Sequence, residues 1–122
     1  MTQQYLGTDN IVIAFSGDSA TNEGSFHESM NLAAVWNLPV IFFITNNRYG
    51  ISTDITYSTK IPHLYLRAAA YGMPGHYVED GNDVIAVYEK MQEVIEYVRA
   101  GNGPALVEVE SYRWFGHSTA DA

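Results

Sequence analysis

Two short apolar runs, each followed at once by polar residues, constrain the fold of this 122-residue chain most strongly. The runs cover residues 11–15 and 40–44, and a segment with helical periodicity separates them. Such β-branched runs are typical of strands buried on both faces, as the strands of parallel sheets are. The pattern therefore predicts a β-α-β unit with polar residues at the carboxyl ends of both strands, where open parallel sheets hold their ligands.

The segment between the two runs predicts a turn and then a helix. Residues 17–24 form the Gly-rich turn, and Thr21 or Asn22 can cap the helix that follows. Pro39 ends the connection. The apolar residues of this helix share one face at helical spacing, namely Phe26, Met30, Ala33 and Ala34.

The second half of the chain continues the alternation of helices and strands. An Asp83 cap starts a strongly amphipathic helix that Gly101 ends. The apolar face of that helix consists of Val84, Val87, Tyr88, Met91, Val94, Ile95 and Val98. The other expected segments are a polar lead-in at 1–10, an irregular stretch at 46–61, a short helix at 64–70, a short strand at 76–79, and a strand at 105–110 with one partly exposed face.

This order predicts an α/β fold, with a mainly parallel sheet flanked by helices, in a single domain over residues 1–122. The formal net charge of −8 argues against nucleic acid and anionic membrane surfaces as partners. No apolar run approaches membrane-spanning length. The absence of cysteine excludes disulfides and thiol catalysis and fits a cytoplasmic protein.

Asp18 and Asn47 are the candidate ligand-binding residues, because each follows one of the two predicted strands. Neighbouring parallel strands would bring their side-chain oxygens together, and hard oxygen ligands suit Mg²⁺ that carries a phosphorylated cofactor. Taken alone, a turn aspartate more often caps a helix, and an Asn-Asn pair is usually a turn. The spacing and the flanking sequence decide between these alternatives.

The flanking sequence resembles a known family. Asp18 after Gly17, followed later by the pair Asn46 and Asn47, is similar to the thiamine-diphosphate motif, in which a Gly-Asp-Gly turn precedes an Asn-Asn pair. Residues 26–28, 31–36, 38–40 and 47–52 resemble the alpha subunit of the decarboxylating component of 2-oxo acid dehydrogenase complexes, residues 112–118 resemble its active-site loop, and residues 68–75 resemble the acetoin and pyruvate branches. Family subunits are much longer, so the chain is similar to their central segment.

The resemblance implies a partial thiamine-diphosphate-binding fold with thiamine diphosphate and Mg²⁺ as cofactors. Its implied metal ligands are the side chains of Asp18 and Asn47 and the backbone carbonyl of Tyr49. The implied cofactor-binding residues are Gly17, Asp18, Ser19, Ala20, Asn47, Tyr49 and His117. The cation would neutralise a diphosphate that the acidic chain otherwise repels.

Ser19 departs from the family pattern, which has glycine at this position. If residue 19 needs a positive φ, the side chain costs on the order of 1 kcal/mol, and Ser19→Gly would tighten cofactor binding. If φ is negative, glycine gains nothing and loses the hydroxyl. Serine can therefore either fit and add a donor or weaken the binding of the cofactor.

His117 is the one implied catalytic residue, because the family's loop histidine lies near the reactive end of the cofactor and helps to orient or protonate intermediates. The alternative is a mobile polar loop. Phe115 replaces a histidine that some members carry, and Ser118 matches a serine that is phosphorylated in mitochondrial members. A kinase is not implied by this match, so the modification of Ser118 stays unassigned.

By resemblance, the function is that of the cofactor-binding portion of a 2-oxo acid (pyruvate-like) or acetoin dehydrogenase alpha subunit, an oxidoreductase that passes an acyl group to a lipoyl group. The implied partners are a beta subunit, in an α2β2 assembly that also supplies the activating glutamate, and the lipoyl-bearing core enzyme. The isolated chain is expected to be inactive. The alternative is a truncated, non-catalytic remnant or assembly module that keeps the fold; a plain nucleotide-binding module lacks support, since no GxGxxG is present.

Overall fold

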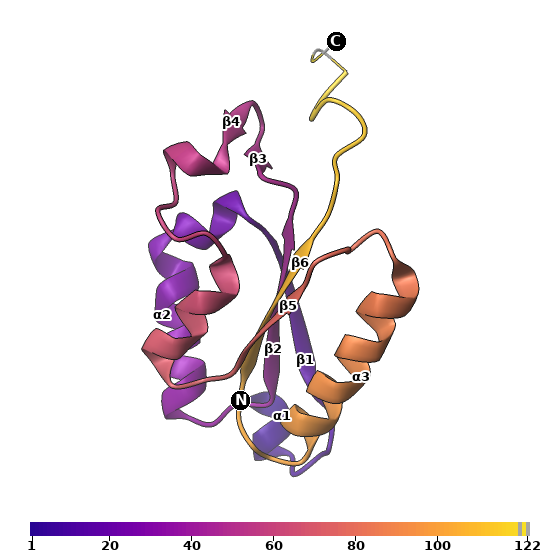
Figure 1. Ribbon diagram of the computed structural model, residues 1–122. Coiled ribbons are helices and arrows are strands. Elements are labelled where there is room, and N and C mark those ends of the chain that lie inside the picture. Colours follow the sequence, from indigo (N-terminus) through magenta and orange to yellow (C-terminus); the bar gives the residue numbers. More distant parts are fainter. Residues whose placement is uncertain (120, 122) are drawn as a thin grey trace.

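A computed structural model describes residues 1–119 and 121, and its centre is a four-stranded parallel sheet (Figure 1). The strand order is β1-β2-β6-β5, and all three neighbouring pairs run parallel. The bounds are β1 Val12–Gly17, β2 Val40–Asn46, β5 Gly75–Val78 and β6 Ala105–Glu110. The predicted α/β class with a mainly parallel sheet is confirmed.

Helices cover both faces of this sheet (Figure 1). Helix α2 (Gly24–Val35) and the 3₁₀ helix η3 (Leu64–Tyr71) lie on one face, and α3 (Val84–Arg99) lies on the other. The first core contains Met30, Ala33, Phe42, Ile44, Leu64, Ala68, Met73 and Leu106. The second contains Ile41, Phe43, Val78, Val94, Val98, Ala105, Val107 and Val109.

Short elements occupy the segments that the sequence predicted to be irregular. The lead-in contains the one-turn helix α1 (Thr2–Tyr5). The stretch after β2 contains a small antiparallel hairpin of β3 (Tyr49–Gly50) and β4 (Thr53–Asp54), followed by the 3₁₀ turn η2 (Ile55–Tyr57). The 3₁₀ turn η1 (Ser19–Asn22) joins β1 to α2.

None of the helices among the described residues combines the length and the apolar character needed to cross a membrane.

The prediction that β1 is buried on both faces is wrong. β1 is an edge strand that pairs only with β2 among the described residues, and Phe15 on it is 73% exposed. Its apolar residues gave the pattern of a buried strand, but burial also depends on how many strands and helices pack around it. An edge position leaves one flank and part of one face uncovered.

The predicted exposed face of the last strand is also wrong. β6 lies between β2 and β5, and Glu108 on it is completely buried. Alternating charged residues in a strand usually point to solvent. Here the central position of β6 places that face beneath η3, so the charged side chain is held by hydrogen bonds within the protein.

The helix caps separate a correct prediction from a wrong one. Asp83 caps α3 as predicted, with its Oδ1 accepting from the backbone N–H groups of Ile85 and Ala86 at 2.9 and 3.3 Å. The cap predicted for α2 is wrong, because that helix starts after Glu23 without a side-chain cap. The Thr21 hydroxyl donates to the backbone carbonyl of Asp18 instead, at 2.6 Å.

The apolar faces of the two long helices fit the predictions to different extents. The α2 face is confirmed, since Met30 and Ala33 are buried in the first core. In α3 the buried stripe runs from Val87 to Val98, whereas Val84 and Tyr88 in its first turns are exposed. The first turns of α3 are therefore more exposed than its second half, where Val94 and Val98 are buried.

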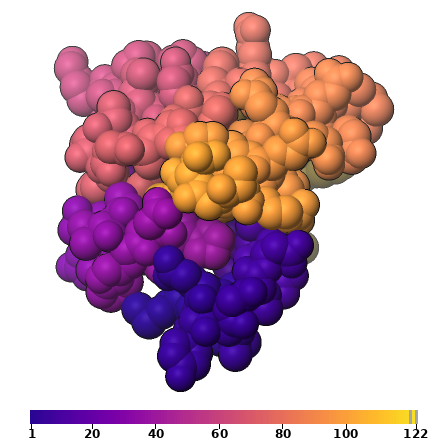
Figure 2. Space-filling view, turned by 90° about the horizontal axis from the view of Figure 1, so that it is seen from below, coloured from indigo at the N-terminus to yellow at the C-terminus, as the bar shows by residue number. Residues whose placement is uncertain are grey.

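The two ends of the sheet differ in what surrounds them. The amino ends of the strands meet the N-terminal segment and the connection between α3 and β6, which lie side by side in Figure 2. There Asn37 donates from its amide to the Gly101 carbonyl at 3.0 Å. The carboxyl ends carry η1, the β3–β4 hairpin and the segment after β6, so the candidate site residues lie at one end (Figure 1).

We expect Asp83→Ala to lower the free energy of unfolding by about 1 kcal/mol, because two N–H groups in the first turn of α3 lose their acceptor. Asp83→Asn is the matched control and should retain most of the stability, since asparagine caps about as well. Urea unfolding of the three proteins measures this. Equal stability of the alanine variant and the parent would contradict the assigned cap.

Candidate functional site

The register of β1 and β2 brings the two halves of the motif to one place. Gly17, the last residue of β1, lies opposite Thr45, so Asp18 emerges beside the end of β2 and the Asn46 and Asn47 pair. The Asn47 backbone is one of the groups that oppose the raising of the Asp18 pKa by burial, so the two turns lie close together. The prediction that Asp18 and Asn47 occupy neighbouring strand ends is therefore correct. The convergence of their side-chain oxygens and their role as metal ligands stay predictions.

The Asp18 carboxylate is buried and incompletely satisfied. Its residue is 2% exposed, and Oδ2 has no hydrogen-bond partner among the described residues. Burial raises its pKa, although hydrogen bonds from its own backbone, the Asn47 backbone and the Ser19 hydroxyl, together with the charge of Arg113, oppose that shift. A buried carboxylate oxygen with no donor is costly unless a cation approaches it.

The turn after β2 is shaped by two side-chain amides. Asn46 Oδ1 accepts from Arg48 N at 2.9 Å, and Asn47 Oδ1 accepts from Tyr49 N at 3.0 Å. Arg48 has a φ of +68°, a left-handed conformation that few non-glycine residues adopt. The two Asx-type hydrogen bonds hold this turn and place Asn47 and Tyr49 after the strand end.

Ser19 has a structural role that the sequence did not indicate. It opens the right-handed turn η1, so its backbone does not need glycine, and the expected gain from Ser19→Gly loses its basis. Its hydroxyl bonds to the Asp18 carboxylate. A Cβ added to Gly50 would lie only 2.0 Å from Ser19 Oγ, so the glycine in β3 makes room for the serine.

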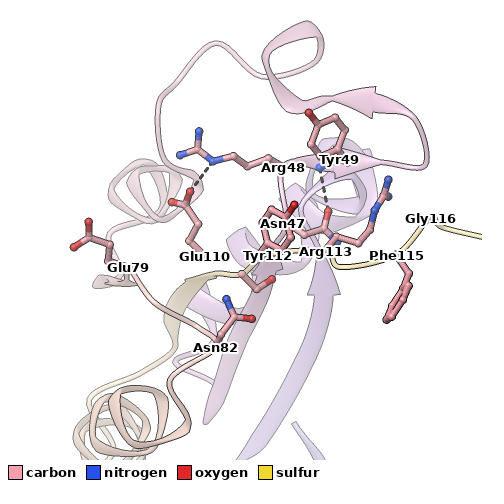
Figure 3. A pocket seen from close by; sticks show the side chains of 11 residues that line it. Asn47, Arg48, Tyr49, Glu79, Asn82, Glu110, Tyr112, Arg113, Phe115 and Gly116 are labelled. Carbon is pink, nitrogen blue, oxygen red and sulfur yellow. Dashed lines mark hydrogen bonds and ion pairs between the residues drawn. The ribbon is translucent and has the colours of Figure 1, made fainter.

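A pocket of about 510 Å³ opens beside Asn47 at the carboxyl ends of β2, β5 and β6 (Figure 3). Its lining consists of Asn47, Arg48, Tyr49, Glu79, Asn82, Glu110, Ser111, Tyr112, Arg113, Phe115 and Gly116. Asp18, Ser19 and Ala20 lie outside this lining. Asn47 thus stands between the buried carboxylate and an open space large enough for a small molecule.

Two arginines organise the walls of this pocket. The Arg113 guanidinium donates to the Ile51 carbonyl at 2.8 Å and lies 5.5 Å from the centre of the Tyr49 ring, which ties the segment after β6 to the hairpin. Arg48 pairs with Glu110 at 2.6 Å, as Figure 3 shows. Although burial opposes the shift, hydrogen bonds from Arg48 and Tyr77 lower the pKa of Glu110. Glu110 therefore stays ionised as a fixed acceptor.

The remaining predicted residues are only partly drawn into the site. Gly17 ends β1 and Ala20 lies in η1, both near Asp18. His117 is exposed and follows the last residue that lines the pocket, in a segment that leaves the sheet beyond β6 (Figure 1). Ser118 donates from its backbone to Asp121 at 3.0 Å. The cofactor-binding and catalytic roles predicted for these residues stay predictions.

The donor set at Asp18 fits a cation held in part by a non-protein ligand. Among the residues that the structure describes, no three His, Cys, Asp or Glu side chains gather in a way that could hold a metal ion. Asp18 supplies one carboxylate with a free oxygen, and Asn47, in the neighbouring turn, carries an amide oxygen that accepts from Tyr49 N. Mg²⁺ is commonly held by one or two such ligands together with phosphate oxygens and water.

Comparison with known proteins agrees with this geometry. The family model described as the dehydrogenase E1 component matches residues 1–122, the whole chain. The chain belongs to this family.

Curated relatives of this family member come from several branches. It is 49% identical over 122 residues to the alpha subunit of acetoin:2,6-dichlorophenolindophenol oxidoreductase of Bacillus subtilis, covering 100% of this chain and 36% of that protein. It is 46% identical to the 3-methyl-2-oxobutanoate dehydrogenase alpha subunit of Mycobacterium tuberculosis, with 99% and 33% covered. The alpha subunit of the pyruvate dehydrogenase E1 component of Rhizobium meliloti is 42% identical, with 97% and 34% covered. The chain therefore spans about a third of the length of these relatives.

Solved structures share the fold at low sequence identity. Transketolase from Leishmania mexicana matches with a TM-score of 0.65 at 20% identity, covering 83% of this chain and 15% of that one. A structure titled as a putative thiamin diphosphate-dependent enzyme from Mycobacterium smegmatis matches with a TM-score of 0.55 at 20% identity, covering 91% and 20%. The predicted thiamine-diphosphate-type fold, present in part, is confirmed.

Sequence reasoning missed two charged residues that support the site. Arg67 on η3 donates to the Thr21 carbonyl at 2.6 Å and to Asn22 Oδ1 at 2.7 Å, which braces the turn that follows Asp18. Glu108 on β6 accepts from Asn46 Nδ2 at 2.6 Å. The available signal for Glu108 was the first of two alternating acids after three apolar residues of a strand, a pattern that also fits an exposed face.

The raised pKa of Asp18 sets an expected pH dependence of stability in the absence of divalent cations. A carboxyl whose pKa is higher in the folded than in the unfolded state favours folding when protonated, so the parent loses stability as pH rises through that range. Asp18→Asn removes the buried charge. We expect this variant to be more stable than the parent at neutral pH, with the difference shrinking as pH falls below the folded-state pKa.

Urea unfolding in the presence of a chelator, repeated across acidic to neutral pH, measures this difference. Asp9→Asn is the control for charge, because Asp9 is exposed in the N-terminal segment at the other end of the sheet. A variant Asp18→Asn that is less stable than the parent at every pH would contradict the assigned burial cost.

Proposed function

We propose that this chain supplies the Mg²⁺- and thiamine-diphosphate-holding part of the alpha subunit of a 2-oxo acid or acetoin dehydrogenase. The observation that carries the proposal is the buried Asp18 carboxylate, whose Oδ2 has no partner and which touches the turn of Asn47. The family and the branches of its relatives support the reaction class. For the substrate, the proposal names a class, which is a pyruvate-like 2-oxo acid or acetoin, and not one compound.

In this proposal Asp18 and Asn47 bind the cation through side-chain oxygens, and Tyr49 does so through its backbone carbonyl. The free Asp18 oxygen and the Asn47 turn support the first two roles. Gly17, Ser19 and Ala20 place the backbone of the η1 turn against the diphosphate. Thiamine diphosphate, when bound, supplies the electron sink for breaking a carbon–carbon bond beside a carbonyl.

The loop after β6 contributes the groups nearest the substrate in this proposal. Arg113, held on the Tyr49 ring and the Ile51 carbonyl, keeps the start of the loop against the hairpin. His117 then donates a proton to, or orients, the reacting group as a general acid. Its exposure supports this role, because a loop histidine can approach a ligand that reaches the pocket edge.

Partners complete the site. The activating glutamate comes from a beta subunit in an α2β2 assembly, and the acyl group passes to a lipoyl group on the core enzyme. Large exposed apolar side chains support an interface, and they include Phe15, Trp36, Tyr49, Tyr112, Trp114 and Phe115. A cytoplasmic location, inferred from the absence of cysteine, belongs to the same proposal.

The second candidate function is a non-catalytic remnant or assembly module with the same fold. The exposed apolar surface favours it, because an assembly module needs a surface for its partners. The two candidates differ in one measurable property, which is cofactor binding that depends on Mg²⁺.

A calorimetric titration tests the proposal. Thiamine diphosphate is titrated into the chain in the presence of Mg²⁺, together with any beta-type partner. We expect saturable, Mg²⁺-dependent binding by the parent and no binding by Asp18→Ala, because the cation loses its anionic protein ligand. Asp9→Ala removes the same charge at the opposite end of the sheet and should bind as the parent does. If thiamine diphosphate binds Asp18→Ala and the parent with equal affinity, the non-catalytic remnant or assembly module becomes the better-supported candidate.

We also expect the purified chain without a partner to associate and to turn over no 2-oxo acid. A domain of this size buries only about two thirds of the surface that its unfolded chain exposes, so an apolar patch stays available for a partner. Light scattering over a concentration series and binding of a hydrophobic dye measure this. A clean monomer without dye binding, or decarboxylation by the isolated chain, would contradict it.

A further inference from the structure

Glu108 is an ionisable residue at the centre of an apolar sheet. It is 0% exposed, and its neighbours along β6, Val107 and Val109, are both buried in the second core. Apolar residues at such positions usually stabilise a protein as well as a buried charge does, or better. The carboxylate is therefore expected to do something that an apolar residue cannot.

Both oxygens of this carboxylate accept hydrogen bonds from groups next to the site. Oε1 accepts from Asn46 Nδ2 at 2.6 Å, and Oε2 accepts from the backbone N–H of Tyr65 at 2.9 Å. The first bond joins β6 to the end of β2, and the second joins β6 to η3. A carboxylate suits this place because two donors face it and it offers only acceptors.

Asn46 connects Glu108 to the turn that contains Asn47. Its amide nitrogen is held by Glu108, and its Oδ1 accepts from Arg48 N at 2.9 Å across the turn that contains Asn47. Since the Asn46 side chain is buried, rotation of its amide would remove both bonds at once. The left-handed backbone of Arg48, with φ +68°, depends on that acceptor.

Helix η3 links this support to the other half of the motif. The backbone N–H of Tyr65 donates to Glu108 Oε2. Burial lowers the pKa of Arg67, and electrostatic interactions with Tyr71 and Glu108 oppose that shift. Arg67 also donates to Thr21 Oγ1 at 2.8 Å, and that hydroxyl bonds to the Asp18 carbonyl at 2.6 Å. The same helix thus braces both turns.

We propose that Glu108 is a positioning residue that sets the metal-binding turn by orienting the amide of Asn46. The inference rests on the proposed function, because it concerns the affinity of that site for Mg²⁺. Groups that orient metal ligands typically change metal affinity about ten- to a hundred-fold when they are mutated. Glu108 touches neither the cation nor the cofactor in this proposal.

Glutamine at position 108 gives the sharpest test, because it keeps the size of the side chain and removes one acceptor. Its amide group would turn an N–H₂ toward either Asn46 Nδ2 or Tyr65 N, so two donors would face each other. We expect E108Q to raise the Mg²⁺ concentration needed for half-maximal thiamine diphosphate binding about ten-fold or more. The measurement uses the full chain with any partner subunit that co-purifies.

V107A is the matched control. Val107 neighbours Glu108 and is fully buried, but it belongs to the core on the other face of the sheet. Its truncation should lower the melting temperature through a cavity and leave the Mg²⁺ requirement of the folded protein unchanged. The control thus separates a loss of stability from a loss of positioning.

A double-mutant cycle with N46A tests the route of the effect. If Glu108 acts through Asn46, N46A alone weakens Mg²⁺ binding, and adding E108Q to N46A causes little further loss. Independent losses that add would overturn the proposal, as would an E108Q protein with a lower melting temperature and the Mg²⁺ requirement of the parent. If E108Q does not fold, N46A decides, and an unchanged Mg²⁺ requirement in N46A overturns the proposal.

Thiamine diphosphate binding by the parent, measured with and without Mg²⁺, distinguishes failure of this inference from failure of the proposed function. A parent that binds thiamine diphosphate without any need for Mg²⁺, or not at all, overturns the proposed function and this inference with it. A parent that shows Mg²⁺-dependent binding, together with an E108Q variant that matches it, overturns the positioning role alone.

Discussion

The parallel pairing of β2 with β1 on one side and β6 on the other is the constraint on which the site depends. Strands that run in the same direction end at the same edge, so the turns after all three strands are neighbours. The register places Gly17 opposite Thr45 and Asn46 opposite Glu110. Segments far apart in sequence therefore meet, and a shift of the register would separate the two halves of the motif.

Buried charge gives this edge its chemistry. The Asp18 carboxylate has a free oxygen, and Glu108 has both oxygens bonded. In a low-dielectric interior a satisfied carboxylate fixes its partners, whereas an unsatisfied one attracts a cation. The two acids are thus suited to different tasks, one to hold the turn and the other to bind. Asp18 follows β1 and Glu108 lies on β6, with β2 between these two strands.

Much of the fold could be predicted from the sequence, because local patterns determine helices and caps. The spacing of Met30 and Ala33 and the Asp83 cap involve residues within one or two turns of one another. The burial of β1 could not be predicted in this way. Phe15 has the character of a core residue, but an edge position leaves it exposed, and strand order is not a local property.

The candidate site, too, has features that the local sequence predicts and features that depend on strand pairing. The sequence by itself determined the order of strands and turns and the positions of Asp18 and Asn47 after them, since residue type and spacing carry that information. Only the tertiary structure decided that Ser19 needs no glycine, that Glu108 is buried, and that Asn46 is its partner. Asn46 and Glu108 are 62 positions apart, and no local pattern predicts a hydrogen bond that exists only after the strands have paired.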